Sequence, residues 1–151
     1  MKHGALRVIS IAALVLSIAP LCEAAGEDDI PPVVLYGLKV YRAESPEAAF
    51  KTWIVGGPLE GDVSFLNQAT SLFRQTESHY GKYREFDLIK VVDLTPTTKI
   101  IYLQMNFQKG PLFARFVCYR TELNWVIATM DFHTRAELIL PPSFLDGSSK
   151  K

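Results

Sequence analysis

The chain has 151 residues, and its 16 basic and 16 acidic side chains give a formal net charge of zero at pH 7. A surface for nucleic acid or for anionic lipid headgroups requires a basic excess, so the composition argues against both as partners. The chain has two cysteines, Cys22 and Cys118, which excludes a small scaffold held together by several disulfides.

Residues 1–24 carry the three parts of a secretory signal peptide. Two basic residues precede an apolar run from Ile9 to Leu21, and small side chains before and at Ala24 offer a cleavage site. The run is shorter than the roughly 20 apolar residues of a membrane span. We therefore expect cleavage after Ala24, export to the periplasm or the extracellular space, and no membrane span. The alternative, lipid attachment at Cys22, conflicts with the large Leu21 in front of it.

Residues 25–43 are expected to form an extended N-terminal arm. They begin with an acidic stretch and a Pro pair, and the apolar, β-branched segment 33–41 is typical of a short strand or an extended segment. A helix is predicted next, because Ser45 can cap it and Pro46 suits its first position. The sequence Gly56-Gly57-Pro58 ends this helix.

A longer helix is predicted between Asp62, which can cap it, and Gly81, which can end it. Apolar residues recur there at three- and four-residue spacing and polar residues take the opposite side, which predicts an amphipathic helix. The apolar stripe contains Phe65, Leu66, Ala69, Leu72, Phe73, Thr76 and Tyr80.

From residue 83 the apolar period changes to two, and four strand-like runs follow at 83–94, 99–109, 112–121 and 125–133. The links between them are short, which permits only antiparallel neighbours, because parallel strands need a crossover of about a dozen residues or more. We expect a single α+β domain over residues 44–140, with the helices packed on a four-stranded antiparallel meander. A disordered tail is expected over residues 141–151.

Alternation assigns the side chains of each strand to two faces. The inward set is predicted to contain Phe86, Leu88, Val92, Leu94, Ile101, Leu103, Met105, Phe107, Leu112, Ala114, Phe116, Cys118, Val126, Ala128, Met130 and Phe132. Lys90 interrupts this set and indicates a bulge or a snorkelling lysine.

The outer face is predicted to contain both aromatic and amide side chains, as protein interfaces do. Ile127 and Asp131 are also assigned to this face. A homodimer or docking onto an envelope protein is the first hypothesis for this face, and a solvated sheet with scattered aromatics is the alternative. The expected interface residues are Tyr102, Gln104, Asn106, Phe113, Arg115, Tyr119, Trp125 and His133.

Helices followed by a four-stranded antiparallel meander resemble the cystatin-like fold, and in particular the small exported NTF2-like domains. The resemblance covers about residues 44–140 and rests on element order and patterning. It implies a curved sheet wrapped around the helices. Members of that superfamily include ketosteroid-isomerase-like and dehydratase-like enzymes as well as non-catalytic binding domains.

Two functions therefore remain open. We expect a non-catalytic binding domain that acts through the outer sheet face or through a small cavity between helix and sheet, where a small apolar ligand could bind. The alternative is a cofactor-independent lyase or isomerase in which Asp131 removes a proton and Tyr119 or Tyr102 stabilises the oxyanion. The face assignment opposes this alternative, because it places Asp131 outside and opposite Arg115, as in an ordinary cross-strand ion pair.

No cofactor and no metal are expected. The histidine and cysteine residues that remain after cleavage lack the paired spacing of metal ligands: His79, His133 and Cys118. Cys118 is predicted to be a small buried apolar residue.

Overall fold

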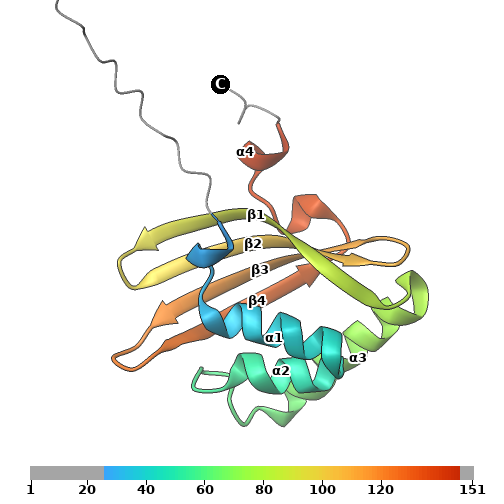
Figure 1. The fold of residues 1–151 in the computed structure, drawn as a ribbon, viewed down its shortest axis with the longest axis horizontal. Helices are drawn as coiled ribbons and strands as arrows, with labels where there is room; N and C mark the ends of the chain where they lie inside the picture. The colour runs from blue at the N-terminus through green and yellow to red at the C-terminus, as the bar shows by residue number, and fades with distance from the viewer. Residues whose placement is uncertain (1–25, 147–151) are drawn as a thin grey trace, which may run out of the picture.

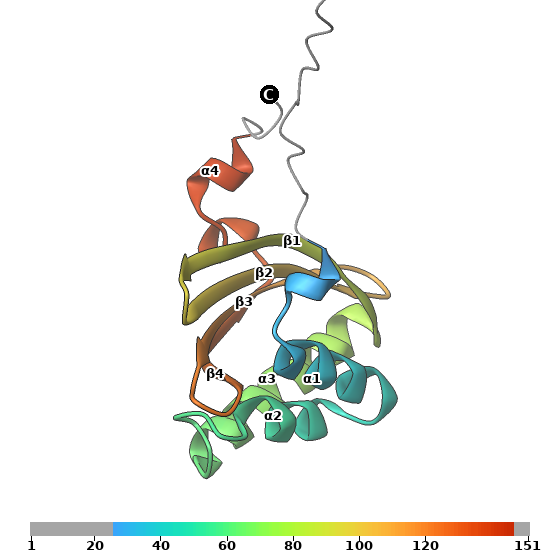
Figure 2. The ribbon, with the colours of Figure 1, turned by 60° about the vertical axis from the view of Figure 1, so that its left-hand side comes forward.

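The computed structural model describes residues 26–146 (Figure 1), so the predicted signal peptide lies outside the described residues. Three helices come first and pack on one face of a curved four-stranded sheet (Figure 2), an α+β arrangement that confirms the predicted fold class. The elements are η1 (Glu27–Asp29), α1 (Pro32–Ala43), α2 (Pro46–Ile54), α3 (Val63–Tyr80), β1 (Tyr83–Thr95), β2 (Thr98–Phe107), β3 (Pro111–Arg120), β4 (Trp125–His133), η2 (Ala136–Leu138) and α4 (Pro142–Leu145).

The expectation of an extended arm before residue 44 is wrong, because residues 32–43 form helix α1. Pro32 takes the first helical position, where its missing N–H costs nothing. Val34, Leu38 and Tyr41 follow at helical spacing and are buried in the main core. Burial of this stripe outweighs the β propensity of the valines, which is a weak preference beside tertiary packing.

Helices α1 and α2 meet at a glycine. The indole nitrogen Nε1 of Trp53, on α2, donates a hydrogen bond of 3.2 Å to the carbonyl oxygen of Val34, on α1. A Cβ atom added at Gly37 would lie 1.9 Å from that same nitrogen. Trp53 is fully buried, so the absence of a side chain at Gly37 is what allows the indole to lie against the α1 backbone.

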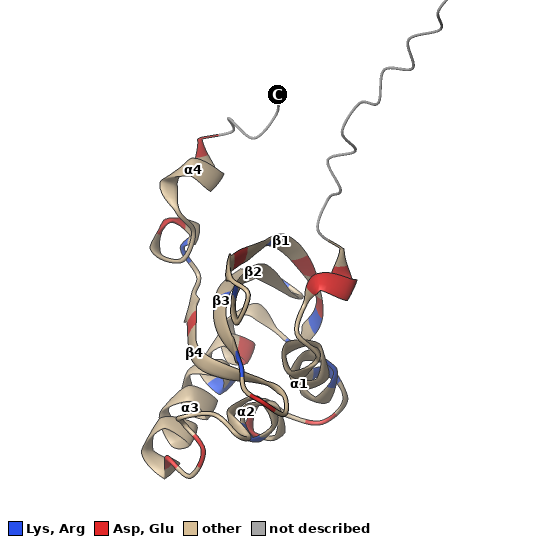
Figure 3. Cartoon of the chain, turned by 90° about the vertical axis from the view of Figure 1, so that its left-hand side faces the viewer, with Lys and Arg blue, Asp and Glu red and all other residues tan. Residues whose placement is uncertain are grey.

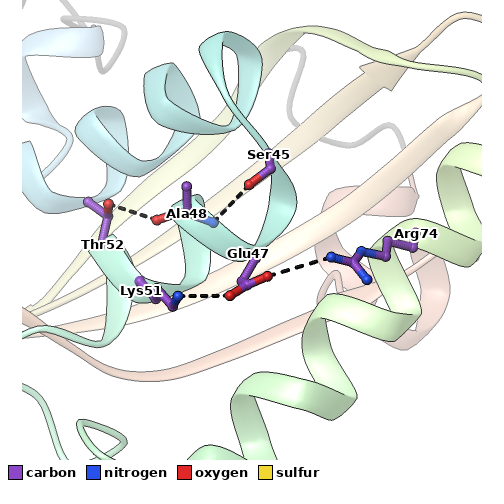
Figure 4. Close-up of polar contacts among 6 residues, drawn as sticks. All are labelled: Ser45, Glu47, Ala48, Lys51, Thr52 and Arg74. Carbon is purple, nitrogen blue, oxygen red and sulfur yellow. Dashed lines mark hydrogen bonds and ion pairs between the residues drawn. The ribbon is translucent and has the colours of Figure 1, made fainter.

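The predicted helix ends are confirmed. Oγ of Ser45 accepts a hydrogen bond of 3.1 Å from the amide of Ala48 (Figure 4), and Asp62 accepts one of 2.9 Å from the amide of Phe65. Gly81 ends α3 with φ of 79°, a conformation that glycine adopts without strain.

Glu47 connects α2 with α3 (Figure 4). One of its carboxylate oxygens lies 2.7 Å from Nζ of Lys51, and the other lies 3.5 Å from Nη2 of Arg74 on α3. The hydrogen bond from Lys51 is the main cause that lowers the pKa of the Glu47 carboxyl. This exposed contact favours the observed helix pairing without being part of the core.

The strands form an antiparallel meander in the order β1-β2-β3-β4, as the short links predicted. The inward sets of β2 and β3 are confirmed, since their predicted apolar residues are buried in the main core. Aromatic rings fill the space between this face and the helices: Phe73 lies 4.8 Å from Phe132 and 4.9 Å from Phe50, and Trp53 lies 5.2 Å from Phe116, measured between ring centroids.

A bulge changes the facing of residues in β1. The register shifts between Leu88 and Lys90, which confirms the bulge that the misplaced lysine indicated. Beyond the shift, Val91 instead of Val92 faces the main core. Leu94, predicted to point inward, is 61% exposed.

A register shift between β3 and β4 exchanges the faces of the first residues of β4. Val117 pairs with Thr129, but the next residue, Cys118, pairs with Ile127 and Tyr119 pairs with Val126, so that Ala128 is skipped. Ile127 is therefore fully buried in the main core, and Trp125 packs against the same core. Both residues were predicted on the outer face, and a one-residue slip is sufficient to exchange the two faces.

The chain continues across the outer face of the sheet as a C-terminal strap, which we define as residues 134–146. Ile139, Leu140 and Phe144 pack against Tyr102 and Phe113 there, and the rings of Tyr102 and Phe144 meet edge to face at 5.2 Å. Figure 3 shows η2 and α4 on the side of the sheet away from α1. The prediction of disorder from residue 141 is therefore wrong as far as residue 146, and residues 147–151 lie outside the described range.

Candidate functional site

The central part of the outer face carries an ion pair between neighbouring strands. Arg115 and Asp131 are direct partners in the β3–β4 register. Nε and Nη2 of Arg115 donate hydrogen bonds of 3.0 and 2.8 Å to the same oxygen, Oδ2 of Asp131. The hydrogen bond to Asp131 is the main cause that raises the pKa of Arg115. The predicted cross-strand ion pair is thus present, and its side chains are 40% and 44% exposed.

We expect the coupling energy between Arg115 and Asp131 to be about 0.2–1 kcal/mol. The two charges are half-exposed, so the free energy gained by pairing is small relative to that of the separately hydrated side chains. A double-mutant cycle with Arg115→Ala and Asp131→Ala, followed by urea denaturation, measures this quantity. A coupling energy of about 3 kcal/mol or more would contradict the solvated surface described above.

The side-chain amides on β2 take part in a hydrogen-bond network. Nε2 of Gln104 donates a hydrogen bond of 2.7 Å to Oδ1 of Asn106, and Nδ2 of Asn106 donates one of 2.7 Å to Oδ2 of Asp87 on β1. The network thus uses amide groups that were predicted to bind a partner. It also places them on the half-exposed sheet surface and outside the packed space between helices and sheet.

The aromatic residues predicted for the interface are dispersed. The strap covers Tyr102, which is 6% exposed, and packs on Phe113. Trp125 lies toward the main core, and Tyr119 remains 48% exposed. Nδ1 of His133 accepts a hydrogen bond of 2.9 Å from the amide of Arg135. The outer face is therefore partly occupied by the chain itself.

The residues proposed for proton transfer are only partly brought together. Tyr102, Arg115 and Asp131 form one row across β2, β3 and β4, with the arginine in the middle. Tyr119 pairs with Val126 and is four positions beyond Arg115 on β3. At the rise of a strand, the two residues are roughly 13 Å apart. Asp131 is held by a cation, and its row lies on the partly solvated outer face.

A cleft of about 800 Å³ lies elsewhere, between α1, α2 and the turn that joins β3 to β4. Three large apolar side chains on its border are strongly exposed: Tyr36 at 63%, Val55 at 57% and Leu123 at 88%. Val33 and Trp125 also line it. A concave site with exposed apolar side chains is the usual form of a binding surface.

The charged groups of this cleft stand on opposite walls. Lys51 comes from α2 and is held 2.7 Å from Glu47, whereas Arg120 and Glu122 come from the hairpin. Within residues 26–146, neither Arg120 nor Glu122 takes part in an ion pair. Since Glu47 already balances Lys51, Arg120 is the cation of this lining that has no ion-pair partner among the described residues.

Sequence reasoning missed this cleft because three segments distant in sequence form it. One local signal was present: Leu123 is a large apolar residue in the otherwise polar turn Glu122-Leu123-Asn124. Tyr36 and Val55 gave no such signal, since the segment of Tyr36 was expected to be extended.

Cys118 is confirmed as a buried free thiol. Its side chain is fully buried, and desolvation raises the pKa of the thiol to about 12. Since the thiolate is the reactive form, we expect the folded protein to react with the disulfide reagent DTNB at neutral pH at least roughly a thousand times more slowly than the urea-unfolded protein. Rapid reaction of the folded protein would show that β3 opens at Cys118, and Cys118→Ala gives the baseline.

Comparison with protein families, curated proteins and solved structures finds no match to this chain. Among residues 26–146, no three or more His, Cys, Asp or Glu side chains are grouped so that they could hold a metal ion. None of the helices in this described part combines the length and apolar character needed to cross a membrane.

Proposed function

We propose that this chain is a non-catalytic binding domain and that its binding surface is the cleft between α1, α2 and the β3–β4 turn. The observation that carries the proposal is the gathering of Tyr36, Val55 and Leu123 around one concavity. Leaving large apolar side chains in water costs free energy that a bound partner recovers.

The occupant that fits this cleft is an apolar segment of another protein that carries an acidic residue. The exposed apolar side chains lie on the open border of the cleft, which suits a segment of another protein. A small ligand would favour a site that encloses most of the ligand's surface. Arg120, which has no ion-pair partner within residues 26–146, favours an acidic residue on its side of the occupant. Export through the predicted signal peptide would make this partner a periplasmic or extracellular protein.

The alternative function, a cofactor-independent lyase or isomerase, has less support. It needs a carboxylate in a site shielded from water, whereas the side chain of Asp131 is 44% exposed and is held by Arg115. It also needs a tyrosine donor beside that carboxylate, whereas Tyr119 lies further along the strand. The resemblance to NTF2-like domains stays a prediction and favours neither function.

The proposal is tested by selecting from a display library of random 12-residue peptides on the mature protein. We expect enrichment of peptides that combine large apolar residues with Asp or Glu. Their affinity should fall about tenfold or more in Leu123→Ser and in Tyr36→Ser, because a few large side chains carry most of the free energy of an interface. Arg120→Gln should weaken acidic peptides and reduce the salt dependence of their binding.

Leu94→Ser is the matched control, since Leu94 is 61% exposed on β1 and does not line the cleft. It should leave the peptide affinity unchanged. Selection of no peptides above a blank surface, or of peptides whose affinity both cleft variants leave intact, would refute the proposed binding surface.

A further inference from the structure

The two edge strands of the sheet differ in their protection against pairing. The β1 edge carries three register shifts. Its side chains also include a series of charged groups: Arg84, Glu85, Asp87, Lys90 and Asp93. Bulges and charges are the usual means by which proteins prevent a second chain from adding to an edge. Strand β4 has one shift near its start and then runs regularly from Thr129 to His133.

The first half of the β4 edge is covered, and the second half borders a cleft. Gly57 lies so close to the strand that a Cβ atom added there would be 2.6 Å from the carbonyl oxygen of Ile127. Further along, a cleft of about 400 Å³ lies between α3 and residues 130–132. Phe65 and Leu72 line the α3 side, and Leu72 is 45% exposed. An added strand thus has both an open edge and an apolar surface beside it.

Asp131 and His133 each retain an unused hydrogen-bonding atom on the outer face of this half-strand. Nε and Nη2 of Arg115 both donate to Oδ2 of Asp131, and Oδ1 has no partner among the described residues. Nδ1 of His133 accepts from the amide of Arg135, which leaves its proton on Nε2, and Nε2 has no partner among residues 26–146. One atom is an acceptor and the other is a donor.

We propose that a second copy of this chain binds this edge, with the two β4 strands antiparallel about a two-fold axis at Phe132. In this register Asp131 lies opposite the second copy's His133, and His133 lies opposite the second copy's Asp131. Each pair joins a free carboxylate oxygen to a free imidazole N–H, on the same face of the extended sheet. The strand is therefore complementary to itself, as an isologous interface requires.

Charge also selects this register. Moving the axis to Asp131 would place two aspartates opposite each other, and like charges in that position are destabilising. Because the paired segment is short, the interface belongs to the small, weak class, and the dimer forms at micromolar or higher concentration. The cleft proposed for partner binding is not part of this contact, so the two proposals stand independently.

A pair of cysteine variants tests the register directly. In the proposed dimer, position 131 faces position 133 of the second copy, whereas identical positions are diagonal neighbours roughly 7–8 Å apart, which is too far for a disulfide. A mixture of Asp131→Cys and His133→Cys proteins should therefore form covalent heterodimers on mild oxidation. Neither variant alone should do so. Cys118 does not interfere, because it is buried.

The mass of the unmodified mature protein by light scattering gives the second readout. We expect it to rise toward twice the monomer mass across a roughly hundredfold increase in protein concentration. Asp131→Lys should abolish this rise, and the exchange Asp131→His with His133→Asp should restore it. Arg115→Ala is the matched control, because it removes the ion pair within the chain and leaves both edge groups in place.

A monomer at every concentration would overturn the proposal, as would covalent dimers formed equally by the single cysteine variants. Dimers that persist in Asp131→Lys would also overturn it, since they would have to use another surface, such as the outer sheet face.

Discussion

Replacing Gly37 by alanine is expected to lower the free energy of unfolding by about 3 kcal/mol, although alanine is the better helix former. The helix propensity of alanine would contribute about 1 kcal/mol in its favour. The added methyl group, however, would overlap the Trp53 indole, whose Nε1, Cδ1 and Cε2 atoms lie 1.9, 2.2 and 2.5 Å from the new Cβ position. The indole is fully buried and its surroundings are closely packed, so α1 and α2 must separate.

Urea denaturation of Gly37→Ala measures this loss, and Trp53→Leu supplies the control. Leucine replaces the rigid ring by two methyl groups that can turn away from the new side chain, so Gly37→Ala should cost much less in a Trp53→Leu background. The strong non-additivity is the expected signature of direct overlap. An equal cost in both backgrounds would mean that the indole is not the group that opposes the methyl.

The parts of the fold that the sequence could predict are those fixed by short-range patterns. Ser45, Asp62 and Gly81 mark helix ends because each acts on backbone groups within a few residues of itself. The meander follows from short links, and the inward sets of β2 and β3 follow from strict alternation. None of these inferences required knowledge of a distant contact.

The parts that could not be predicted depend on contacts between distant segments. Segment 33–41 has the β-branched composition of a strand, and only the burial of Val34, Leu38 and Tyr41 against other elements makes it a helix. The reversal of Trp125 and Ile127 depends on a one-residue shift in the pairing with β3, which no pattern within β4 reveals.

The candidate sites show the same division. The pairing of Arg115 with Asp131 was predicted, because it requires only that two adjacent strands have their residues in register. The cleft around Tyr36, Val55 and Leu123 was not, because it joins the start of α1 to a turn about 90 residues later. The strap altered the predicted interface for a similar reason, since three apolar residues near the C-terminus gave no indication of which surface they would cover.

Replacing Phe73 by alanine is expected to be the most damaging single change in the core, with a loss of about 3–5 kcal/mol in the free energy of unfolding. Phe73 is fully buried on α3, and its ring meets Tyr41 of α1, Phe50 of α2 and Phe132 of β4 at 5.5, 4.9 and 4.8 Å between centroids. One side chain thus contacts all the layers of the domain. Its removal loses apolar burial and edge-to-face contacts and leaves a cavity that rigid neighbouring rings cannot fill.

The neighbouring residue is the control for this measurement. Leu72→Ala alters the same turn of α3, but Leu72 is 45% exposed, so urea denaturation should show a loss of about 1 kcal/mol or less. If Phe73→Ala still folds, its apolar cavity should bind benzene, and benzene should restore part of the lost stability in that variant alone. Equal losses for the two variants would contradict the packed aromatic interior, and with it the argument that binding takes place at the surface.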